Sequence, residues 1–218
     1  MAKIAIILSG CGFLDGSEIY ESVLTFLALD RAGAEYQCFA PNIPQKRVVN
    51  YLTKEPLVNV SRNVLEESAR LARGAIKDIA EANPKEFAAI IFPGGFGAAL
   101  NLCDFAEKGG DAEVNPQVLS IAKSFKETNK PLGFICIAPA MIPLICGKGV
   151  TMTIGNDQST AQTVESMGAV HQSCLATDIV IDQAHKVVST PAYMLGKSIA
   201  EVATGIEKLV KAVLELIE

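Results

Sequence analysis

The sequence contains no tryptophan, only two histidines and few clustered basic residues. Its longest basic cluster is Lys46–Arg47, and the formal net charge is −5. A nucleic-acid-binding face needs clustered basic side chains, so no nucleic-acid partner is expected. No apolar stretch reaches the length needed to span a bilayer, so no membrane partner is expected either. The two histidines, His171 and His185, lie in no ligand pattern, which argues against a zinc site or another metal site.

Six cysteines are present, but their positions do not suggest a disulfide framework. Cys38 lies in a strand-like segment, and Cys103 and Cys146 lie in helix-like ones. The first apolar run, Lys3–Leu8, is too short for a signal peptide and has the character of a first strand. We therefore expect reduced thiols in a reducing compartment and predict a cytoplasmic location.

Strand-like and helix-like patterns alternate along the chain. Continuous apolar runs are typical of parallel strands buried on both faces, and they occur at 4–9, 87–93 and 131–136, with further strand signals at 35–40 and 150–154. Helix patterns lie at 17–32, 63–73, 116–129, 157–167 and 195–217. Residues 179–189 indicate a small hairpin, and the irregular segment 41–61 predicts a short hairpin or lid. The sequence predicts one α/β domain over residues 1–218, with a mostly parallel sheet, helices on both faces and a small C-terminal hairpin.

Cys136 is the most informative residue. The apolar segment Gly133–Ile135 stops at this cysteine, and a helix-like stretch follows. A thiol in a strand-to-helix turn is aimed at the N-terminus of the next helix, where unpaired N–H groups favour the reactive thiolate. Free cysteines are also common in cores, so the residue type alone leaves a structural role open.

Two other loops follow apolar strands and carry complementary groups. Ligand sites in open α/β sheets form at the carboxyl ends of strands where the strand order reverses, so these loops are expected to meet Cys136. The loop 10–17 and the following helix bring the carboxylates of Asp15, Glu18 and Glu21. Gly94 and Gly95 bring backbone amides unhindered by a Cβ atom, which suit an oxyanion.

Each of these features also has a structural interpretation. The glycine spacing in Gly10–Gly16 does not fit a dinucleotide-binding fingerprint, and no phosphate-binding lysine follows it. The Gly94–Gly95 pair is equally consistent with a turn that needs positive φ, and acidic residues are common in first helical turns. Of the two helix carboxylates, Glu21 is favoured over Glu18 as the partner of the thiol. Cys11 is expected to open onto the same crevice as an accessory thiol.

Six segments together resemble the ElbB-type branch of the PfpI and class I glutamine amidotransferase-like superfamily. They span nearly the whole chain and read Ile7-Leu-Ser-Gly-Cys-Gly12, Asp15-Gly-Ser-Glu-Ile19, Phe92-Pro-Gly-Gly-Phe-Gly-Ala-Ala99, Cys136-Ile-Ala-Pro-Ala-Met141, Thr153-Ile-Gly155 and Thr190-Pro-Ala-Tyr-Met-Leu195. The resemblance implies a flavodoxin-like three-layer sandwich that forms a homodimer.

The resemblance also implies roles for individual residues. Cys136 would be the nucleophile at an elbow, Gly95 and Ile137 would contribute to an oxyanion site, and Glu21 would be the acidic partner. The implied activity is a glyoxalase, with protein deglycase activity and a loose link to isoprenoid biosynthesis. Hydrolytic relatives place a histidine directly after the cysteine or later in the chain. In this sequence Ile137 follows Cys136, so peptidase and glutaminase activities are not expected.

The expected reaction needs no cofactor. Cys136 would add to a small aldehyde substrate, glyoxal or methylglyoxal, and Glu21 or Glu18 would move a proton between the two carbons. Glycolate or lactate would then be released by water. The alternative from another class is a non-catalytic redox-sensing or regulatory protein that uses an oxidisable Cys136.

Overall fold

A seven-stranded sheet organises the computed structural model, which describes residues 2–217. The strand order is β3-β2-β1-β4-β5-β9-β8, and every neighbouring pair is parallel except β8 with β9. The strands are β1 (Lys3–Ile7), β2 (Glu35–Ala40), β3 (Ile76–Asp78), β4 (Ala89–Phe92), β5 (Leu132–Ile135), β8 (Val180–Asp182) and β9 (Val187–Thr190). The mostly parallel sheet and the C-terminal hairpin agree with the sequence prediction.

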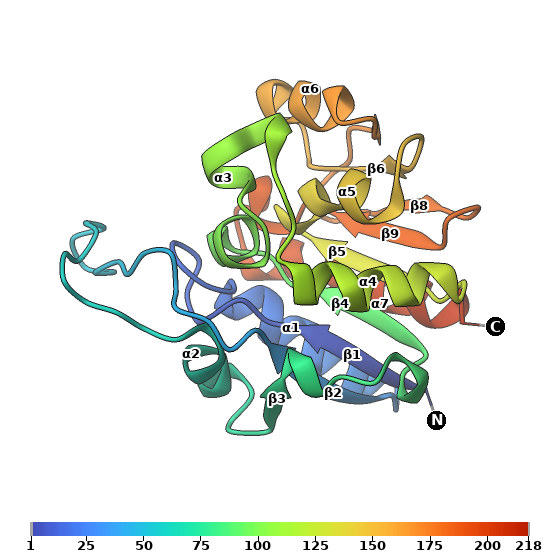
Figure 1. Ribbon diagram of the computed structural model, residues 1–218. Coiled ribbons are helices and arrows are strands. Elements are labelled where there is room, and N and C mark those ends of the chain that lie inside the picture. Colours follow the sequence, from blue (N-terminus) through green and yellow to red (C-terminus); the bar gives the residue numbers. More distant parts are fainter. Residues whose placement is uncertain (1, 218) are drawn as a thin grey trace.

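Helices cover both faces of this sheet (Figure 1). The helices α1 (Ile19–Arg31) and α7 (Ile199–Glu215) pack together on one face, and α4 (Pro116–Glu127) and α5 (Ile142–Cys146) lie on the other. Along β1, Ile4 and Ile6 belong to the core on the α1 side, whereas Ala5 and Ile7 belong to the opposite core. Alternating side chains of one strand thus fill two cores, which explains the uninterrupted apolar run. The predicted single-domain, flavodoxin-like three-layer sandwich is confirmed.

A second, two-stranded sheet departs from the prediction of a single sheet. The segment predicted at 150–154 forms β6 (Thr151–Met152), which pairs in parallel with β7 (Val170–His171) outside the main sheet. The carboxylate of Asp182 joins the two sheets, because its Oδ2 accepts a 2.8 Å hydrogen bond from the Thr151 amide. Helix α6 (Gln158–Ser166) links β6 to β7, and α3 (Phe105–Lys108) lies near it (Figure 1).

Local capping decides where the terminal helix begins. The sequence pattern predicts a start at Leu195, but α7 begins at Ile199 because the Ser198 hydroxyl accepts the Glu201 amide at 3.2 Å. Asn63 caps α2 (Val64–Leu71) in the same way. The sequence analysis does not predict the edge strand β3, because this strand has only three residues and one of them is a lysine, so it forms no apolar run.

Residues 41–61, termed the strap, project from the body beside α2 (Figure 1). Isolated antiparallel bridges join Pro44 to Asn63 and Val49 to Pro56. The segment is therefore hairpin-like, as its prolines and length indicate. Across residues 2–217, no helix combines the length and the apolar character that a membrane crossing needs.

Candidate active site

Three loops meet at the carboxyl ends of β1, β4 and β5. The strand order reverses between β1 and β4, which is the usual place for a site in such a sheet. Backbone hydrogen bonds join the loops after β1 and β4 directly: the Glu18 amide donates to Gly94 O at 2.9 Å, and the Gly97 amide donates to Gly16 O at 2.9 Å. The loop after β5 meets them at Gly94, which lies against Cys136. The structure thus brings together the three loops that the sequence singles out.

Cys136 occupies a left-handed backbone conformation at the end of β5, with φ of 63°. This conformation costs a non-glycine residue about 1–2 kcal/mol. The Cys136 amide donates to Thr190 O of β9 at 2.9 Å, so the turn remains anchored to the sheet. The backbone amides of Gly95 and Ile137 lie beside the sulfur and lower the pKa of the thiol. A sharp turn between β5 and the short 3-10 helix Ala138–Met141 therefore holds the thiol against two N–H donors.

Glu21 lies in the first turn of α1 and is completely buried. Its Oε2 accepts the Gly94 amide at 3.0 Å, and its Oε1 accepts the Tyr193 amide at 3.2 Å. Its carboxyl group also lies next to the Cys136 thiol, and the two groups shift each other's pKa. Elements from three parts of the chain thus fix one carboxyl group beside one sulfur.

Gly94 is needed for this approach. A Cβ atom added at Gly94 would overlap the Cβ of Cys136 and would lie 2.5 Å from Glu21 Oε2. The amide of Gly94 is already bound by Glu21, so the oxyanion role expected for Gly94 does not fit. The amides that face the sulfur belong to Gly95 and Ile137.

The pair lies in a poorly solvated environment, and both pKa values reflect it. Burial, followed by the charge of Glu18, raises the pKa of Glu21 from 4.5 to about 8. Burial, followed by the charge of Glu21, raises the pKa of Cys136 well above 9, although the Gly95 and Ile137 amides oppose this shift. The Glu21–Cys136 pair therefore keeps both of its protons below about pH 8.

This result corrects the expectation of a thiolate stabilised by a helix N-terminus. The 3-10 segment after Cys136 has four residues and α5 has five, so little helix dipole acts on the sulfur. Burial and a neighbouring carboxyl group dominate instead. Removing one proton from the pair, rather than from the thiol alone, is the step that would generate a nucleophile.

Glu18 lies at the wall of a pocket, whereas Glu21 lies behind it. The pocket has a volume of about 680 Å³, and both Glu18 and Cys136 line it. Glu18 caps α1, with its Oε2 accepting the Glu21 amide at 2.7 Å. Burial raises the pKa of Glu18 as well, although the backbone amides of Glu21, Tyr20 and Ile19 act in the opposite direction.

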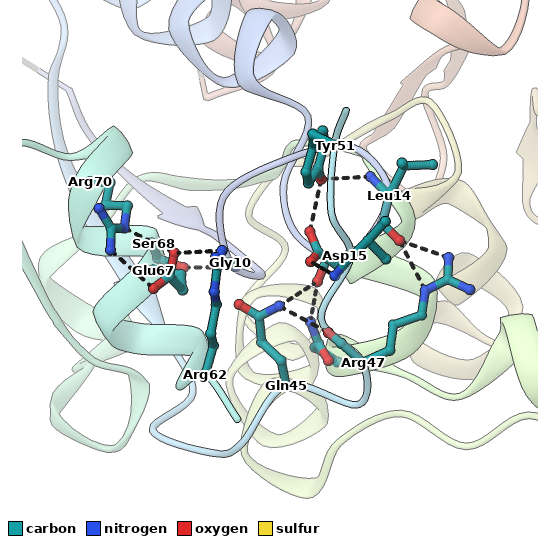
Figure 2. A network of polar contacts seen from close by, with 12 residues as sticks. Gly10, Leu14, Asp15, Gln45, Arg47, Tyr51, Arg62, Glu67, Ser68 and Arg70 are labelled. Atoms are coloured by element: carbon teal, nitrogen blue, oxygen red, sulfur yellow. Dashed lines mark hydrogen bonds and ion pairs between the residues drawn. The ribbon is translucent and has the colours of Figure 1, made fainter. Parts of the chain in front are cut away.

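Neither Asp15 nor Cys11 lines this pocket. Figure 2 shows Asp15 within a polar network that includes Gln45, Arg47 and Tyr51 of the strap. Asp15 accepts the Val49 amide and the Tyr51 hydroxyl of the strap, each at 2.8 Å. The charged neighbours of Cys11 include Glu67 and Arg70 of α2. The expectation that Cys11 opens onto the Cys136 crevice is therefore wrong, because the loop after β1 turns this thiol toward α2.

The two histidines lie in the small sheet and in the β8–β9 turn. His171 is in β7, and His185 Nδ1 lies 3.0 Å from Asp182 Oδ2. Neither residue lines the pocket that contains Cys136. Among the described residues, no group of three or more His, Cys, Asp or Glu side chains is arranged to hold a metal ion.

Sequence reasoning missed two parts of the site. The Tyr193 amide binds Glu21, yet a backbone donor leaves no signal in its own side chain. The aromatic residues Phe13, Tyr20 and Phe96 line the pocket. The two phenylalanines lie within glycine-rich loops, outside the strands and helices that build the hydrophobic core. Large apolar side chains in such loops are the sequence signal that could have identified them.

Solved structures share this fold. An isoprenoid biosynthesis protein with an amidotransferase-like domain from Ehrlichia chaffeensis is 36% identical, with a TM-score of 0.93 and full coverage of both chains. A DJ-1 superfamily protein from Salmonella typhimurium is 21% identical, with a TM-score of 0.56 over 93% of this chain and 84% of that one. The fold is thus that of the DJ-1, ThiJ and PfpI class of proteins.

Curated relatives narrow this class to a family. The mitochondrial ES1 protein homolog of Rattus norvegicus is 43% identical over 99% of this chain and 84% of its own length. The mitochondrial glutamine amidotransferase-like class 1 domain-containing protein 3 of Homo sapiens is 42% identical over 99% of this chain and 83% of its own length. The chain belongs to this family of ES1-type, glutamine amidotransferase-like class 1 proteins. No family model matches the chain.

These relatives contradict the predicted cytoplasmic location, since the ES1 proteins of rat and zebrafish and the human protein are all named as mitochondrial. The prediction rested on unpaired cysteines. Free thiols indicate a reducing environment, but they do not distinguish one reducing compartment from another.

Proposed function

We propose that the protein converts 2-oxoaldehydes to 2-hydroxy acids without glutathione or a cofactor, using Cys136 as the nucleophile. One observation carries this proposal. A buried carboxyl group lies next to a buried thiol that lines a pocket, and each group shifts the pKa of the other, while the amides of Gly95 and Ile137 lie beside the sulfur. Such a pair can exchange one proton and form one covalent bond, as covalent aldehyde chemistry requires.

The first step is addition to the aldehyde. The pair loses one proton, the sulfur bonds to the aldehyde carbon, and the carbonyl electrons move to oxygen. The amides of Gly95 and Ile137 stabilise this oxyanion. Glu21 takes the proton that the thiol gives up and passes it to the oxyanion, which gives a hemithioacetal and leaves Glu21 as a carboxylate.

The second step is an internal oxidation and reduction. Glu21 removes the proton from the sulfur-bearing carbon, and the electron pair reduces the neighbouring carbonyl through an enediol. A proton returned to the second carbon leaves a thioester at the first. The first carbon is oxidised by two electrons and the second is reduced by two, so no external oxidant takes part. Water then cleaves the thioester, releases the hydroxy acid and restores the thiol.

Glu18 is the second carboxyl group of this proposal. It faces the pocket and lies beside Glu21 along α1, so it can pass a proton between the buried pair and solvent. Separate Glu18→Gln and Glu21→Gln variants assign the roles. A larger rate loss in Glu21→Gln supports Glu21 as the base, and a larger loss in Glu18→Gln transfers that role to Glu18.

Hydrolysis of amides is not proposed. An amidase needs a group that protonates the leaving amine, and histidine has that role in Cys–His sites. In this chain Ile137 follows Cys136, and His171 and His185 are absent from the pocket lining. Addition to an aldehyde expels no amine, so one carboxyl group suffices. We expect no measurable glutaminase or peptidase turnover.

The test measures glycolate formed from glyoxal with glutathione absent. Cys136→Ala is expected to lower turnover by at least about 10³-fold, because the covalent step disappears. Cys11→Ala is the matched control and is expected to stay within about twofold of wild type, since Cys11 faces α2. Equal turnover in Cys136→Ala and wild type would refute the proposal. Stoichiometric sulfenic acid formation with peroxide and no turnover would favour the redox-sensing alternative, although the raised pKa of Cys136 opposes rapid oxidation.

A further inference from the structure

The pocket over Cys136 is larger than the proposed chemistry requires. Its volume of about 680 Å³ is in the range typical of sites for drug-sized ligands. Glyoxal has four non-hydrogen atoms and would leave most of this space to water. The pocket therefore has room for the remainder of a larger molecule beyond the reacting carbonyl groups.

Aromatic side chains form the mouth of this pocket. Phe13 comes from the loop after β1, Tyr20 from α1 and Phe96 from the loop after β4, and their exposed fractions are 44%, 49% and 46%. Phe105 of α3, which is buried, and Tyr193 also line the pocket. Three half-exposed rings converging on one opening leave a large apolar area in water, and such patches mark binding sites.

The charged groups around the pocket disfavour the binding of an anionic ligand. Glu18 is the one lining residue with a charged side chain, and no lysine, arginine or histidine lines the pocket within residues 2–217. Arg47 approaches the outer part of the mouth, with its guanidinium 5.4 Å from the Phe96 ring centre, but its N–H groups donate to Leu14 O. An anionic group in the pocket would lose water and gain no basic partner.

We infer that the substrate is a 2-oxoaldehyde whose second carbon carries a neutral, apolar body about the size of an aromatic ring. This inference rests on the proposed function, because it retains the Cys136 chemistry. The aldehyde end reaches the sulfur and the Gly95 and Ile137 amides, while the body lies among the aromatic side chains. The product is the corresponding 2-hydroxy acid, formed by the same two-electron internal transfer and the addition of one water.

The kinetic test compares glyoxal, phenylglyoxal and 4-carboxyphenylglyoxal. Each kcat/KM is divided by the rate constant of the same aldehyde with a simple thiol, which removes differences in intrinsic reactivity. The corrected value for phenylglyoxal is expected to exceed that for glyoxal by about tenfold or more, since a buried ring adds apolar contact. The carboxylated probe is expected to fall at least about tenfold below phenylglyoxal. Corrected values that are equal for the three probes would overturn the inference.

Variants locate the preference in the aromatic mouth. Phe13→Ala with Phe96→Ala is expected to reduce the ratio of phenylglyoxal to glyoxal by about tenfold. Both side chains are half-exposed, so the fold tolerates the change. Leu52→Ala with Val58→Ala removes two exposed apolar side chains of the strap and leaves the ratio within about twofold. A ratio that is unchanged in the Phe13/Phe96 variant would overturn the assignment.

A second measurement does not depend on turnover. Alkylation of Cys136 by iodoacetamide at pH 9 is followed by peptide mass mapping in the presence of acetophenone, acetone or benzoate. Acetophenone is expected to slow alkylation at least about fivefold more than the other two, because it alone is both aromatic and neutral. Equal protection by all three would overturn the inference. Selective protection by acetophenone without turnover of any 2-oxoaldehyde would instead refute the proposed function and retain an apolar binding pocket.

Discussion

Two buried acidic regions flank the loop after β1, and they differ in what surrounds their carboxyl groups. In the region of Figure 2, Glu67 pairs with Arg70 and Arg62, and Asp15 accepts hydrogen bonds from the strap. At the candidate site, Glu21 meets two amides, a thiol and the nearby charge of Glu18. Cations and hydroxyl donors hold the first group of carboxylates in place. At the second site no cation contributes to the pKa of Glu21, which rises to about 8.

The difference shows how one residue type serves two purposes. A carboxylate that meets arginines, or donors of a neighbouring segment, holds parts of the structure together. A carboxyl group that is buried beside a thiol and another acidic residue, without a cation among the groups that shift its pKa, exchanges a proton near neutral pH. The same burial that weakens Glu21 as a structural element suits it to proton transfer. Variants in each region test this contrast.

Among the carboxylate variants, the largest effect is expected from Glu21→Gln. It keeps the size of the side chain but cannot exchange a proton, so glyoxal turnover is expected to fall by about 10²-fold or more. In wild type, kcat/KM is expected to rise with pH and level off above about 8, where the pair has lost its first proton, and this plateau is expected to be absent in the variant, because only the thiol is left to lose a proton. Circular dichroism checks the fold.

The matched control is Glu67→Gln, which alters a buried carboxylate of the other region. Turnover is expected to stay within about threefold of wild type, since Glu67 contacts arginines and does not line the pocket. Turnover lost equally in both variants would mean that the contrast between the two regions does not hold.

Asp15→Ala is expected to act on stability rather than on chemistry. The change removes the acceptors of the Val49 amide and the Tyr51 hydroxyl and leaves a buried donor unpaired. The free energy of unfolding is expected to fall by about 2–3 kcal/mol, as measured by urea denaturation. Glu55→Ala, at an exposed acidic position of the strap, is expected to change it by less than about 0.5 kcal/mol. If the free energy of unfolding changes by less than about 0.5 kcal/mol in Asp15→Ala as well, the Asp15 carboxylate does not hold the strap in place.

The third prediction concerns pH and stability. The pKa of Glu21 is 4.5 as an ordinary side chain and about 8 in the folded protein, so between these values the folded state holds a proton that the unfolded chain releases. The free energy of unfolding therefore falls as pH rises, by up to about 1.4 kcal/mol per pH unit from this group. Glu21→Gln removes this dependence, so its stability relative to wild type is expected to increase from about pH 5 to about pH 8. A relative stability that is constant over this range would mean that Glu21 titrates normally.

The smallest effect is expected from the histidines. Replacing both His171 and His185 by Gln is expected to leave aldehyde turnover within about threefold, because neither lines the pocket. The loss of a general base would cost roughly 10²-fold. Activity that collapses in the double variant would show that a histidine reaches Cys136, and the site would then resemble that of an amidotransferase.

Much of the frame follows from the sequence alone. The apolar runs at β1, β4 and β5 identify buried parallel strands, because each run supplies side chains to both cores. The helix pattern that ends at Gly33 places Glu21 near the start of α1. Cys136 directly after an apolar strand predicts a turn, and the left-handed conformation at that turn agrees with it. These signals are local, since they depend on spacing within a few residues.

Tertiary structure alone decided the chemistry of the site. The pKa of Cys136 depends on burial and on Glu21, which belongs to a distant helix, so no local pattern contains it. The side of the loop to which Cys11 turns, the separation of β6 from the main sheet, and the convergence of Phe13, Tyr20 and Phe96 on one opening likewise depend on packing. Desolvation is a property of everything that surrounds a group. A sequence can therefore name the thiol and the carboxyl group, but only the fold brings them together and excludes water from them.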